Sequence, residues 1–417
     1  MTAGDSASGC YLHAAQDFHL ESRPLPPPTG DEVQIAPRCT TLCGSDVHYY
    51  KHFRNGAIQV REPLCLGHET AGEILALGPD VCKTNPDLAV GNAVALECGV
   101  PCEQCALCKN GRYNVCPNLR FRSSASKFPH YQGSLQERVN HPAKWVHKLP
   151  REISFEVGAL LEPLAVAVHA VRRSGAVLEG ARNSCLIFGA GAIGLLCSVA
   201  AQVEGCQDIV MVDIDKDRLQ FALDNGFAQA IYEVKAQRGT TLEESKAIAR
   251  ETAKNIGEVK WRDGNMVGQV QRTFECTGVE SCLQASIYVS PGRLPHPVFF
   301  LGLQHDQATQ SGGSVVLVGM GTPDHTLPIS EISAREISLI PTWRYAGAYE
   351  RAIEIAKASA TGATFNGARL ANVEKLITHR FNGLGSIQEA FDHATKPKDT
   401  SGALIIKVAV GTDGTAK

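Results

Sequence analysis

The pattern of hydrophobic and polar positions divides the chain into two regions with different predicted folds. In the first third, short alternating runs at residues 32–36, 71–76 and 92–96 lie between stretches rich in proline and glycine. Alternating runs that are bounded by turn residues are typical of strands. We therefore expect an all-β or barrel-like fold for this part of the chain.

From about residue 184 the pattern changes, and short segments rich in valine and isoleucine alternate with segments of helix length. The predicted strands are residues 184–188, 208–213, 229–232, 272–276, 314–318 and 337–340. The predicted helices are residues 192–204, 216–225 and 279–289. Strands and helices in alternation predict an α/β fold with a doubly wound parallel sheet.

The part of the chain after residue 346 is too short for an independent domain. Its pattern predicts one helical stretch, a second helix at residues 385–393 and a closing strand at residues 402–408. We expect this part to complete the first domain, so that the doubly wound domain is an insertion. The expected domains are a first domain at residues 1–166, the doubly wound domain at residues 167–342 and a segment at residues 343–417 that completes the first domain.

Composition and charge exclude several classes of partner. The chain has 417 residues, with 40 Lys and Arg against 43 Asp and Glu and a formal net charge of −3. This balance disfavours binding to nucleic acid or to an anionic membrane surface. Residues 1–16 do not resemble a secretory signal, and no apolar run reaches the roughly 18 residues of a membrane span. We therefore expect a cytoplasmic protein, in which clustered cysteines bind metal more often than they form disulfides.

Four of the 15 cysteines have the spacing of a closed zinc site. The residues are Cys102, Cys105, Cys108 and Cys116. Short steps of two intervening residues let thiolates turn onto one ion, and four thiolates leave no open position. We therefore predict a structural zinc lobe at about residues 98–118. Cys98 fits no step of this ladder.

A second set of potential ligands is spread along the chain. Cys43 follows an apolar run, His68 and Glu69 follow another, and Glu162 lies within an apolar segment. Thiolate, imidazole and carboxylate are all zinc ligands, and a site with fewer than four protein ligands leaves room for substrate. Burial of an unpaired carboxylate is costly, so Glu162 needs a partner such as a metal ion. A buried cysteine with a hydrogen-bonded histidine is the alternative interpretation of Cys43 and His68.

Gly189, Gly191 and Gly194 have the G-x-G-x-x-G spacing between a predicted strand and a predicted helix. Such a turn places a pyrophosphate on the helix N-terminus. Asp213 ends the next strand, as the dinucleotide fingerprint requires, and an acidic residue there favours NAD over NADP. Arg218 on the following helix could weaken that preference.

These motifs together resemble the zinc-containing medium-chain dehydrogenase/reductase family, and within it the polyol dehydrogenases that act on sorbitol, xylitol or arabinitol. The likeness spans nearly the whole chain. Besides the cysteine ladder, it rests on residues 43–50, 67–69, 161–164, 189–191, 275–278, 318–320 and 343–345. The resemblance implies a GroES-like β-barrel and a Rossmann domain. Residues 291–312 depart from the family, which has a short turn there, and we interpret them as an inserted loop without an assigned function.

The resemblance also implies roles for individual residues. The catalytic zinc is expected on Cys43, His68 and a carboxylate, and the sequence leaves open whether Glu69 or Glu162 binds directly. The expected substrate contacts are Tyr49, Glu162, Arg344 and Tyr345. The cofactor contacts expected besides the glycine turn are Ile193, Asp213, Arg218, Val318, Gly319, Met320 and Arg344.

The implied reaction is oxidation of a polyol to a ketose by hydride transfer to NAD, with a zinc Lewis acid on the substrate hydroxyl. Ser45 and His48 resemble the proton relay of the family, although His48 could be an ordinary surface histidine. Asp46 is expected to orient His68. The family resemblance also suggests a homo-oligomer, a tetramer, and it leaves open which polyol is preferred. Two alternatives remain, a metal-free NADPH reductase and an interaction protein built on the zinc lobe.

Overall fold

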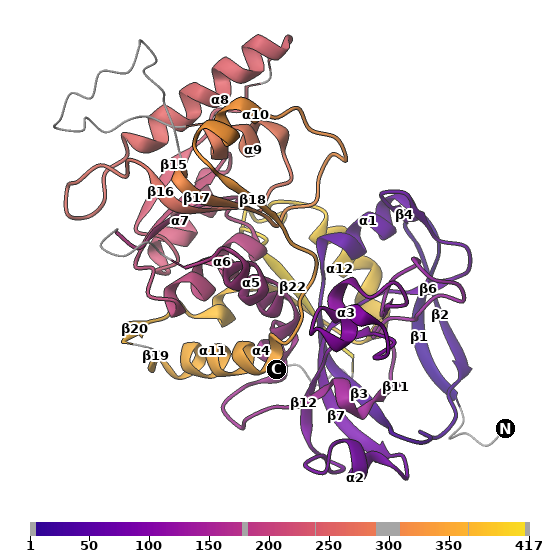
Figure 1. The fold of residues 1–417 in the computed structure, drawn as a ribbon. Helices are drawn as coiled ribbons and strands as arrows, with labels where there is room; N and C mark the ends of the chain where they lie inside the picture. Colours follow the sequence, from indigo (N-terminus) through magenta and orange to yellow (C-terminus); the bar gives the residue numbers. More distant parts are fainter. Residues whose placement is uncertain (1–5, 177–181, 238, 289–308, 366, 413–417) are drawn as a thin grey trace, which may run out of the picture. The chain divides into compact units, whose positions relative to one another are not determined.

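The computed structural model describes residues 6–176, 182–237, 239–288, 309–365 and 367–412, and the chain forms two compact units (Figure 1). Unit 1 comprises Met1–Ala165, Ala346–Thr361 and Val373–Lys417. Unit 2 comprises Val166–Tyr345 and Gly362–Asn372. The segment 362–372 therefore belongs with unit 2 rather than with the rest of the C-terminal part, and the backbone N–H of Ala371 donates to Gln202 there (3.1 Å).

Unit 2 is built on a parallel six-stranded sheet. Its strands are β13 (Ser184–Phe188), β14 (Asp208–Asp213), β15 (Ala230–Glu233), β16 (Val270–Glu275), β17 (Thr309–Leu317) and β18 (Ser338–Pro341). The order β15-β14-β13-β16-β17-β18 reverses direction at β13, which creates the switch point at which doubly wound sheets bind nucleotides. The prediction of a doubly wound parallel sheet is confirmed.

Helices cover both sides of this sheet, with α6 on one side and α8 and α9 on the other (Figure 1). The helices of unit 2 are α6 (Ala192–Val203), α7 (Lys216–Asp224), α8 (Leu242–Gly257), α9 (Glu280–Ile287) and α10 (Ile329–Ala334), and a short hairpin is formed by β19 (Thr364–Phe365) and β20 (Ala368–Arg369). Helix α8 begins with a capping box, because the Thr241 side chain accepts from the N–H of Glu244 while the Glu244 side chain accepts from the N–H of Thr241.

Unit 1 is mainly β. Its strands are β1 (Ser6–Ala14), β2 (Asp17–Pro24), β3 (Glu32–Thr41), β4 (Arg54–Asn55), β5 (Ile58–Gln59), β6 (Leu64–Cys65), β7 (Glu69–Leu77), β8 (Ala93–Leu96), β9 (Gly99–Val100), β10 (Arg120–Phe121), β11 (Val139–Pro142), β12 (Val146–Lys148), β21 (Ile377–Asn382) and β22 (Lys407–Gly411). The largest sheet has the order β12-β8-β7-β3-β22-β21, and β11 also pairs with β3. The all-β pattern predicted for the first third is therefore confirmed, and the C-terminal strands β21 and β22 complete its main sheet.

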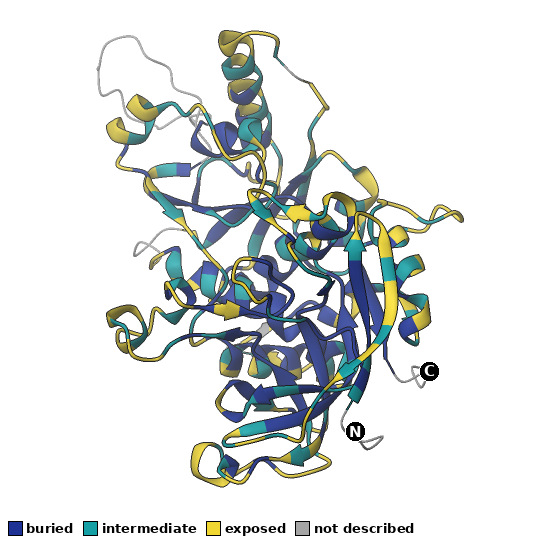
Figure 2. Ribbon diagram, turned by 90° about the vertical axis from the view of Figure 1, so that its right-hand side faces the viewer, coloured by how far each residue is buried: buried dark blue, intermediate teal, exposed yellow. Residues whose placement is uncertain are grey.

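Short helices connect these strands. They are α1 (Gly44–His52), α2 (Val81–Thr84), α3 (Ala106–Lys109), α4 (Phe155–Ala159), α11 (Tyr349–Thr361) and α12 (Ile387–Ala394). Helix α5 (Leu161–Arg173) begins in unit 1 and continues into unit 2. Tyr49 and Tyr50 of α1 share a buried apolar cluster with Phe391 of α12 and Leu64 of β6. Burial of this kind extends along the strands of both main sheets, which Figure 2 shows mostly in the colour of buried residues.

Two predictions from the hydrophobic pattern are wrong in part. The closing strand starts at Lys407 rather than at residue 402, because the Asp399 carboxylate accepts from the backbone N–H groups of Ser401 and Ala403 and holds a turn there. Of the segment 291–312, residues 309–312 begin β17 and are not loop, while residues 291–308 lie outside the described part of the chain. Among the described residues, helices with the length and hydropathy of a bilayer span are absent.

Candidate functional site

Pairing of β3 with β7 brings two of the predicted ligand segments together. Thr41, at the end of β3, lies opposite Glu69, at the start of β7, so Cys43 is close to His68 and Glu69. Gly67 precedes them with a φ of 91°, and a Cβ there would lie 2.9 Å from both Leu135 and Thr40. Only glycine tolerates both the backbone conformation and the close approach. The turn that presents His68 thus depends on Gly67.

The potential ligand atoms of Cys43, His68 and Glu69 all lie within 4.8 Å of one another. His68 and Glu69 are buried and Cys43 is half-buried. A thiolate, an imidazole and a carboxylate at this separation form a donor set that suits zinc and leaves a coordination position open. The structure therefore brings together three of the four residues predicted for the open metal site.

Asp46 holds the imidazole of His68 from behind. Its Oδ2 lies 3.2 Å from Nδ1 of His68, and Oδ1 accepts a hydrogen bond from the hydroxyl of Ser123 (2.5 Å). Burial works to lower the pKa of His68, but the charges of Asp46 and Cys43 outweigh it and raise this pKa well above its ordinary value. Since Nδ1 faces Asp46, Nε2 is the nitrogen left to ligate. Ser123, which the sequence reasoning missed, completes this support.

A lysine that the sequence reasoning also missed lies beside Glu69. Nζ of Lys407, on β22, is 2.5 Å from Glu69 and donates to the carbonyl of Leu42 (2.9 Å). The hydroxyl of Thr41 donates to the same carboxylate. Burial works to lower the pKa of Lys407, but the charges of Glu69, Cys43 and Glu162 and the hydrogen bond to Glu69 together raise this pKa. The signal in the sequence was a single charged residue within the apolar run of residues 403–410.

Glu162 lies buried in the first turn of α5. Its charge acts on Lys407 and on Cys98, which places it beside the same cluster. The Sγ of Cys98 lies 2.6 Å from the carbonyl oxygen of His68, so this cysteine packs behind the site and outside the four-cysteine ladder. Glu162 is thus the second carboxylate near the three clustered ligands.

The other predicted residues of this region lie on α1. The hydroxyl of Ser45 donates to Sγ of Cys43 (3.3 Å), whereas His48 is exposed one turn further on, with its ring centroid 6.1 Å from that of His52. In the described part of the chain, no hydrogen bond joins Ser45 to His48. The ring of Tyr49 is buried, and its hydroxyl accepts from the N–H of Ala125 (3.2 Å).

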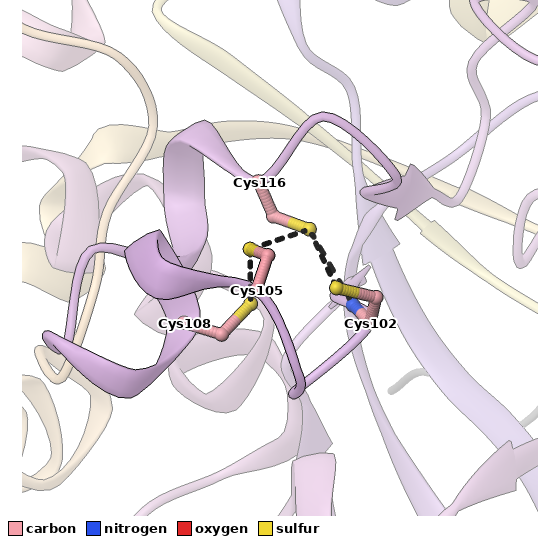
Figure 3. Close-up of side chains that lie close together, drawn as sticks. All are labelled: Cys102, Cys105, Cys108 and Cys116. Carbon is pink, nitrogen blue, oxygen red and sulfur yellow. Dashed lines mark hydrogen bonds between the residues drawn. The ribbon is translucent and has the colours of Figure 1, made fainter.

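The four cysteines of the predicted lobe point their sulfur atoms at one another (Figure 3). The sulfur of Cys105 is 3.5 Å from that of Cys108 and 3.9 Å from that of Cys116, which is 3.5 Å from that of Cys102. A tetrahedron with zinc–sulfur bonds of about 2.3 Å has sulfur–sulfur edges of about 3.8 Å. The backbone N–H groups of Gln104 and Cys105 lower the pKa of Cys102 to about 6, which favours its thiolate. The cluster fits a structural zinc site.

A chain of partly buried hydrogen bonds anchors this lobe to the rest of unit 1. The hydroxyl of Tyr113 donates to Glu97 (2.6 Å) and accepts from the N–H of Gly347 (2.7 Å). Nε2 of His147 lies 2.8 Å from the other oxygen of Glu97. Burial, and next the nearby Glu97 charge, raise the pKa of Tyr113, so its proton stays in place as a donor. Sequence reasoning did not identify this anchor.

In unit 2 the glycine turn lies between β13 and α6, at the switch point of the sheet. Gly189 has a φ of 96°, and a Cβ on Gly194 would lie 1.8 Å from the carbonyl oxygen of Gly189. Gly191 is the N-cap of α6 and Ile193 is half-buried in its first turn. The turn thus has the close backbone packing and the free helix N-terminus of a pyrophosphate site.

Asp213 ends the neighbouring strand and contacts this turn. One of its oxygens accepts from the N–H of Ala190 (2.7 Å) and the other from the N–H of Asp215 (2.9 Å). A carboxylate has about four acceptor sites, so two remain for a ribose. Arg218 lies at the same turn, with Nη1 3.5 Å from where a Cβ on Gly191 would be, and Nε 3.9 Å from Asp215.

The loops that follow β16 and β17 also approach each other closely at glycine residues. A Cβ on Gly319 would lie 2.2 Å from the backbone nitrogen of Gly278, and the N–H groups of Val318 and Gly319 donate to the carbonyl of Glu275. Met320 is exposed, as are Ile214, which follows β14, and Val279, which follows β16. Arg344, with a φ of 51°, and the buried Tyr345 also belong to unit 2.

Comparison with known proteins gives a consistent result. Residues 29–151 match the model of the alcohol dehydrogenase GroES-like domain. The chain is 34% identical to the sorbitol dehydrogenase of Gallus gallus over 393 residues, which cover 94% of each chain. It is 35% identical to the L-arabinitol 4-dehydrogenase of Aspergillus niger over 386 residues, or 92% of this chain and 86% of that protein.

The chain belongs to the zinc-containing medium-chain dehydrogenases of the polyol dehydrogenase type. The crystal structure of L-idonate 5-dehydrogenase from Escherichia coli has the same fold, with a TM-score of 0.74 at 22% identity over 97% of this chain and 98% of that one. The resemblance stated from the motifs is therefore confirmed, as is the fold class of a GroES-like domain with a Rossmann-type sheet. As a medium-chain dehydrogenase, the protein is an oxidoreductase.

Proposed function

We propose that the protein oxidises a secondary hydroxyl of a small polyol, such as sorbitol, xylitol or L-arabinitol, to the ketone of a ketose, with zinc and NAD as cofactors. The observation that carries this proposal is the convergence of Cys43, His68 and Glu69 within 4.8 Å in a buried part of unit 1. The activities named for the sorbitol and arabinitol relatives support the choice of substrate class.

The residues fit a catalytic zinc ion. Cys43, His68 and Glu69 would hold it, and Glu162 would face the open position. When bound, zinc supplies Lewis acidity toward a substrate hydroxyl, and NAD supplies the acceptor for the hydride. The second proposed zinc ion is structural and would be held by Cys102, Cys105, Cys108 and Cys116.

Neighbouring side chains prepare the ligand set. Asp46 fixes the ring of His68 so that Nε2 is presented. Lys407 neutralises part of the negative charge that Cys43, Glu69 and Glu162 concentrate in a buried volume. The oxygens of Glu162, together with Tyr49, Arg344 and Tyr345, are the proposed acceptors and donors for the polyol hydroxyls.

A proton has to leave the site during oxidation. Ser45 already contacts Cys43, and His48 lies three residues further along the same helix, where side chains of a helix are neighbours. We propose that the Ser45 hydroxyl receives the proton and that the exposed imidazole of His48 passes it to solvent. Substrate hydroxyls or water would complete this path.

Binding of NAD is assigned to the switch point of unit 2. The pyrophosphate would lie on the N-terminus of α6 at Gly189 and Gly191, and Asp213 would accept from the ribose hydroxyls. A 2′-phosphate beside Asp213 would be repelled, which favours NAD over NADP. The contacts proposed nearby are those of Ile193, Gly194, Arg218, Val318, Gly319, Met320 and Arg344.

Two alternatives are less well supported. A metal-free NADPH reductase would not need the buried ligand set, and Asp213 opposes its cofactor. An interaction protein built on the zinc lobe would not need the glycine turn. We also propose a cytoplasmic location, where clustered cysteines bind metal more often than they form disulfides. We also propose a homo-oligomer, a tetramer, which light scattering would test.

The test is a metal count and steady-state kinetics on the purified protein with sorbitol, xylitol, L-arabinitol and ribitol. We expect about two zinc ions per chain and NADH formation with at least one polyol. Replacement Asp213→Ser should narrow the preference for NAD over NADP, whereas the exposed control Asp224→Ser should not. Full turnover after complete removal of zinc would refute the metal assignment, and polyol oxidation with NADP but not with NAD would refute the cofactor assignment.

A further inference from the structure

A third group of potential metal ligands lies on the hairpin of β1 and β2, apart from both zinc sites described above. His13 comes from β1, and His19 and Glu21 come from β2. Their ligand atoms lie within 4.8 Å of one another. The hairpin belongs to a separate three-stranded sheet, β2-β1-β6, in which β2 is the edge strand.

Strand geometry explains why these side chains meet. Alternate residues of a strand face the same side, so Asp17, His19, Glu21 and Arg23 share one face of β2. On β1 the register shifts between Leu12 and Ala14. A bulge of this kind re-aims a side chain, and here it brings the ring of His13 over that of His19, with centroids 4.3 Å apart.

The contacts within the group pair the potential ligands with one another and with Asp17 and Arg23. Nε2 of His13 contacts Oε1 of Glu21, and Asp17 lies 3.0 Å from Nε2 of His19, the kind of carboxylate contact that orients a ligand histidine. Arg23 occupies only the other oxygen of Glu21, Oε2, at 2.7 Å, and its guanidinium stacks on the ring of Tyr11 (3.5 Å). One carboxylate oxygen therefore remains directed at the two imidazoles.

Solvent can reach the group. His13 and Glu21 are about one-third exposed, at 31% and 28%, and His19 is 52% exposed. An ion can therefore enter and leave without unfolding of the hairpin, and water can fill the remaining coordination positions. Two imidazoles and one carboxylate select divalent first-row transition ions over magnesium and calcium, which prefer oxygen ligands.

We propose that His13, His19 and Glu21 form a third, solvent-accessible binding site for a divalent transition ion, with zinc as its first probe. Arg23 weakens this site, because it places a positive charge on one of the ligands. The site binds an exchangeable ion, in contrast to the closed four-cysteine cluster.

The test is calorimetric titration of Zn²⁺ into the full-length protein that retains the metal it carries after purification. Uptake is measured beyond that content, so the result does not depend on the proposed enzymatic function. The variants are His13→Gln and His19→Gln, with the half-exposed His393→Gln as the matched control. Each substitution in the site should weaken the additional binding at least about tenfold, whereas the control should leave it unchanged.

Two further measurements keep the test decisive. Arg23→Gln retains all three ligands and removes the competing cation, so it should bind the additional zinc more tightly than the wild type. Zinc should also protect His13 and His19 of the wild type against carbethoxylation, as read by mass spectrometry, and leave His393 reactive. The proposal is overturned if the wild type takes up no additional zinc, or if additional uptake is the same in His13→Gln, His19→Gln and the wild type.

Discussion

The two zinc sites proposed for unit 1 are built in opposite ways. The four-cysteine lobe takes all its ligands from one segment, residues 102–116, and its sulfur atoms mainly contact one another. The other site collects Cys43 from the N-cap of α1, His68 and Glu69 from the residue before β7 and its first residue, and Glu162 from α5. The four ligands of the lobe are chemically equivalent. In the second site Cys43, His68 and Glu69 each contact a different side chain, namely Ser45, Asp46 and Lys407.

This difference separates a stabilising site from a reactive one. Four identical thiolates satisfy an ion completely, so nothing is left for a substrate. A mixed and incomplete set leaves a position open, but its buried charges need compensation from Asp46 and Lys407. We therefore expect the mixed ligand set to serve catalysis and the four-cysteine lobe to stabilise the fold.

One ligand substitution in each site tests most directly whether the two sites have these different roles. His68→Ala should lower kcat/KM by about a thousandfold or more, because Lewis-acid stabilisation contributes several kcal/mol to the barrier. Cys105→Ser should instead lower the thermal midpoint, because binding of a structural ion contributes to folding. Steady-state kinetics and thermal unfolding of both variants measure the two effects.

The metal content of the same two variants provides the control. Each is expected to lose one zinc ion and to retain the other, and the folded fraction of Cys105→Ser should still turn over. If Cys105→Ser abolished turnover at unchanged stability, or if His68→Ala remained active without its metal, the division of roles between the sites would be wrong.

The second prediction concerns the buried ion pair at the open site. Lys407→Met leaves Glu69 as a buried carboxylate without its cation, and loss of one partner of such a pair costs about 3–5 kcal/mol. Urea unfolding should show this loss. Lys396→Met, an exposed substitution in the same part of the chain, should change stability by no more than about 0.5 kcal/mol.

A double variant sharpens this prediction. Glu69→Gln combined with Lys407→Met removes both charges, so it should recover part of the stability that Lys407→Met alone loses. If the double variant lost as much stability as the two single variants together, the interaction between Lys407 and Glu69 would contribute nothing to stability.

The third prediction concerns the support of His68. Asp46→Asn keeps the shape of the side chain but removes its charge, and loss of such a partner typically lowers zinc affinity or activity about 10- to 100-fold. Zinc competition with a chelator and kcat/KM are the measurements. Asp87→Asn, on the exposed surface of unit 1, is the control. An unchanged zinc affinity together with unchanged kcat/KM would contradict the assigned role.

The same contrast explains how much the sequence could predict. The lobe was predictable because its four ligands lie at fixed short spacings, and β13 and β14 matched their predicted bounds because every side chain of β13 and most of β14 are buried. The open site could be predicted only as candidate ligands, since its assembly depends on the pairing of Thr41 with Glu69, and no local pattern specifies that register.

Lys407 shows more clearly what could not be predicted from the sequence. The apolar run that contains it predicted a strand from residue 402, but residues 402–406 precede the strand, and Leu404 pairs instead with Lys398 across the turn at residues 400–401. Lys407 then enters the sheet in the strand that pairs with the end of β3, so its ammonium group reaches Leu42 and Glu69. A long-range contact of this kind has no counterpart in composition or spacing.

The last and smallest expected effect concerns that turn. The hydroxyl of Ser401, then His379 and the N–H of Ala403, hold the pKa of Asp399 far below its usual range. A carboxylate with a lowered pKa in the folded state stabilises the fold above its unfolded pKa of about 3.9, and the contribution is lost as the pH falls further. Asp399→Asn should therefore be less stable than the wild type at neutral pH, with a difference that shrinks toward about pH 3.

Thermal midpoints of both proteins across this pH range measure the difference. Because solvent reaches the Asp399 side chain (19% exposed) but hardly reaches Lys407 (5%), the effect of Asp399→Asn should be smaller than that of Lys407→Met. A difference that grew on acidification would mean that the turn is held by the neutral side chain. In that case the hydrogen bonds to Asp399 would not be what aims Lys407 at the open site.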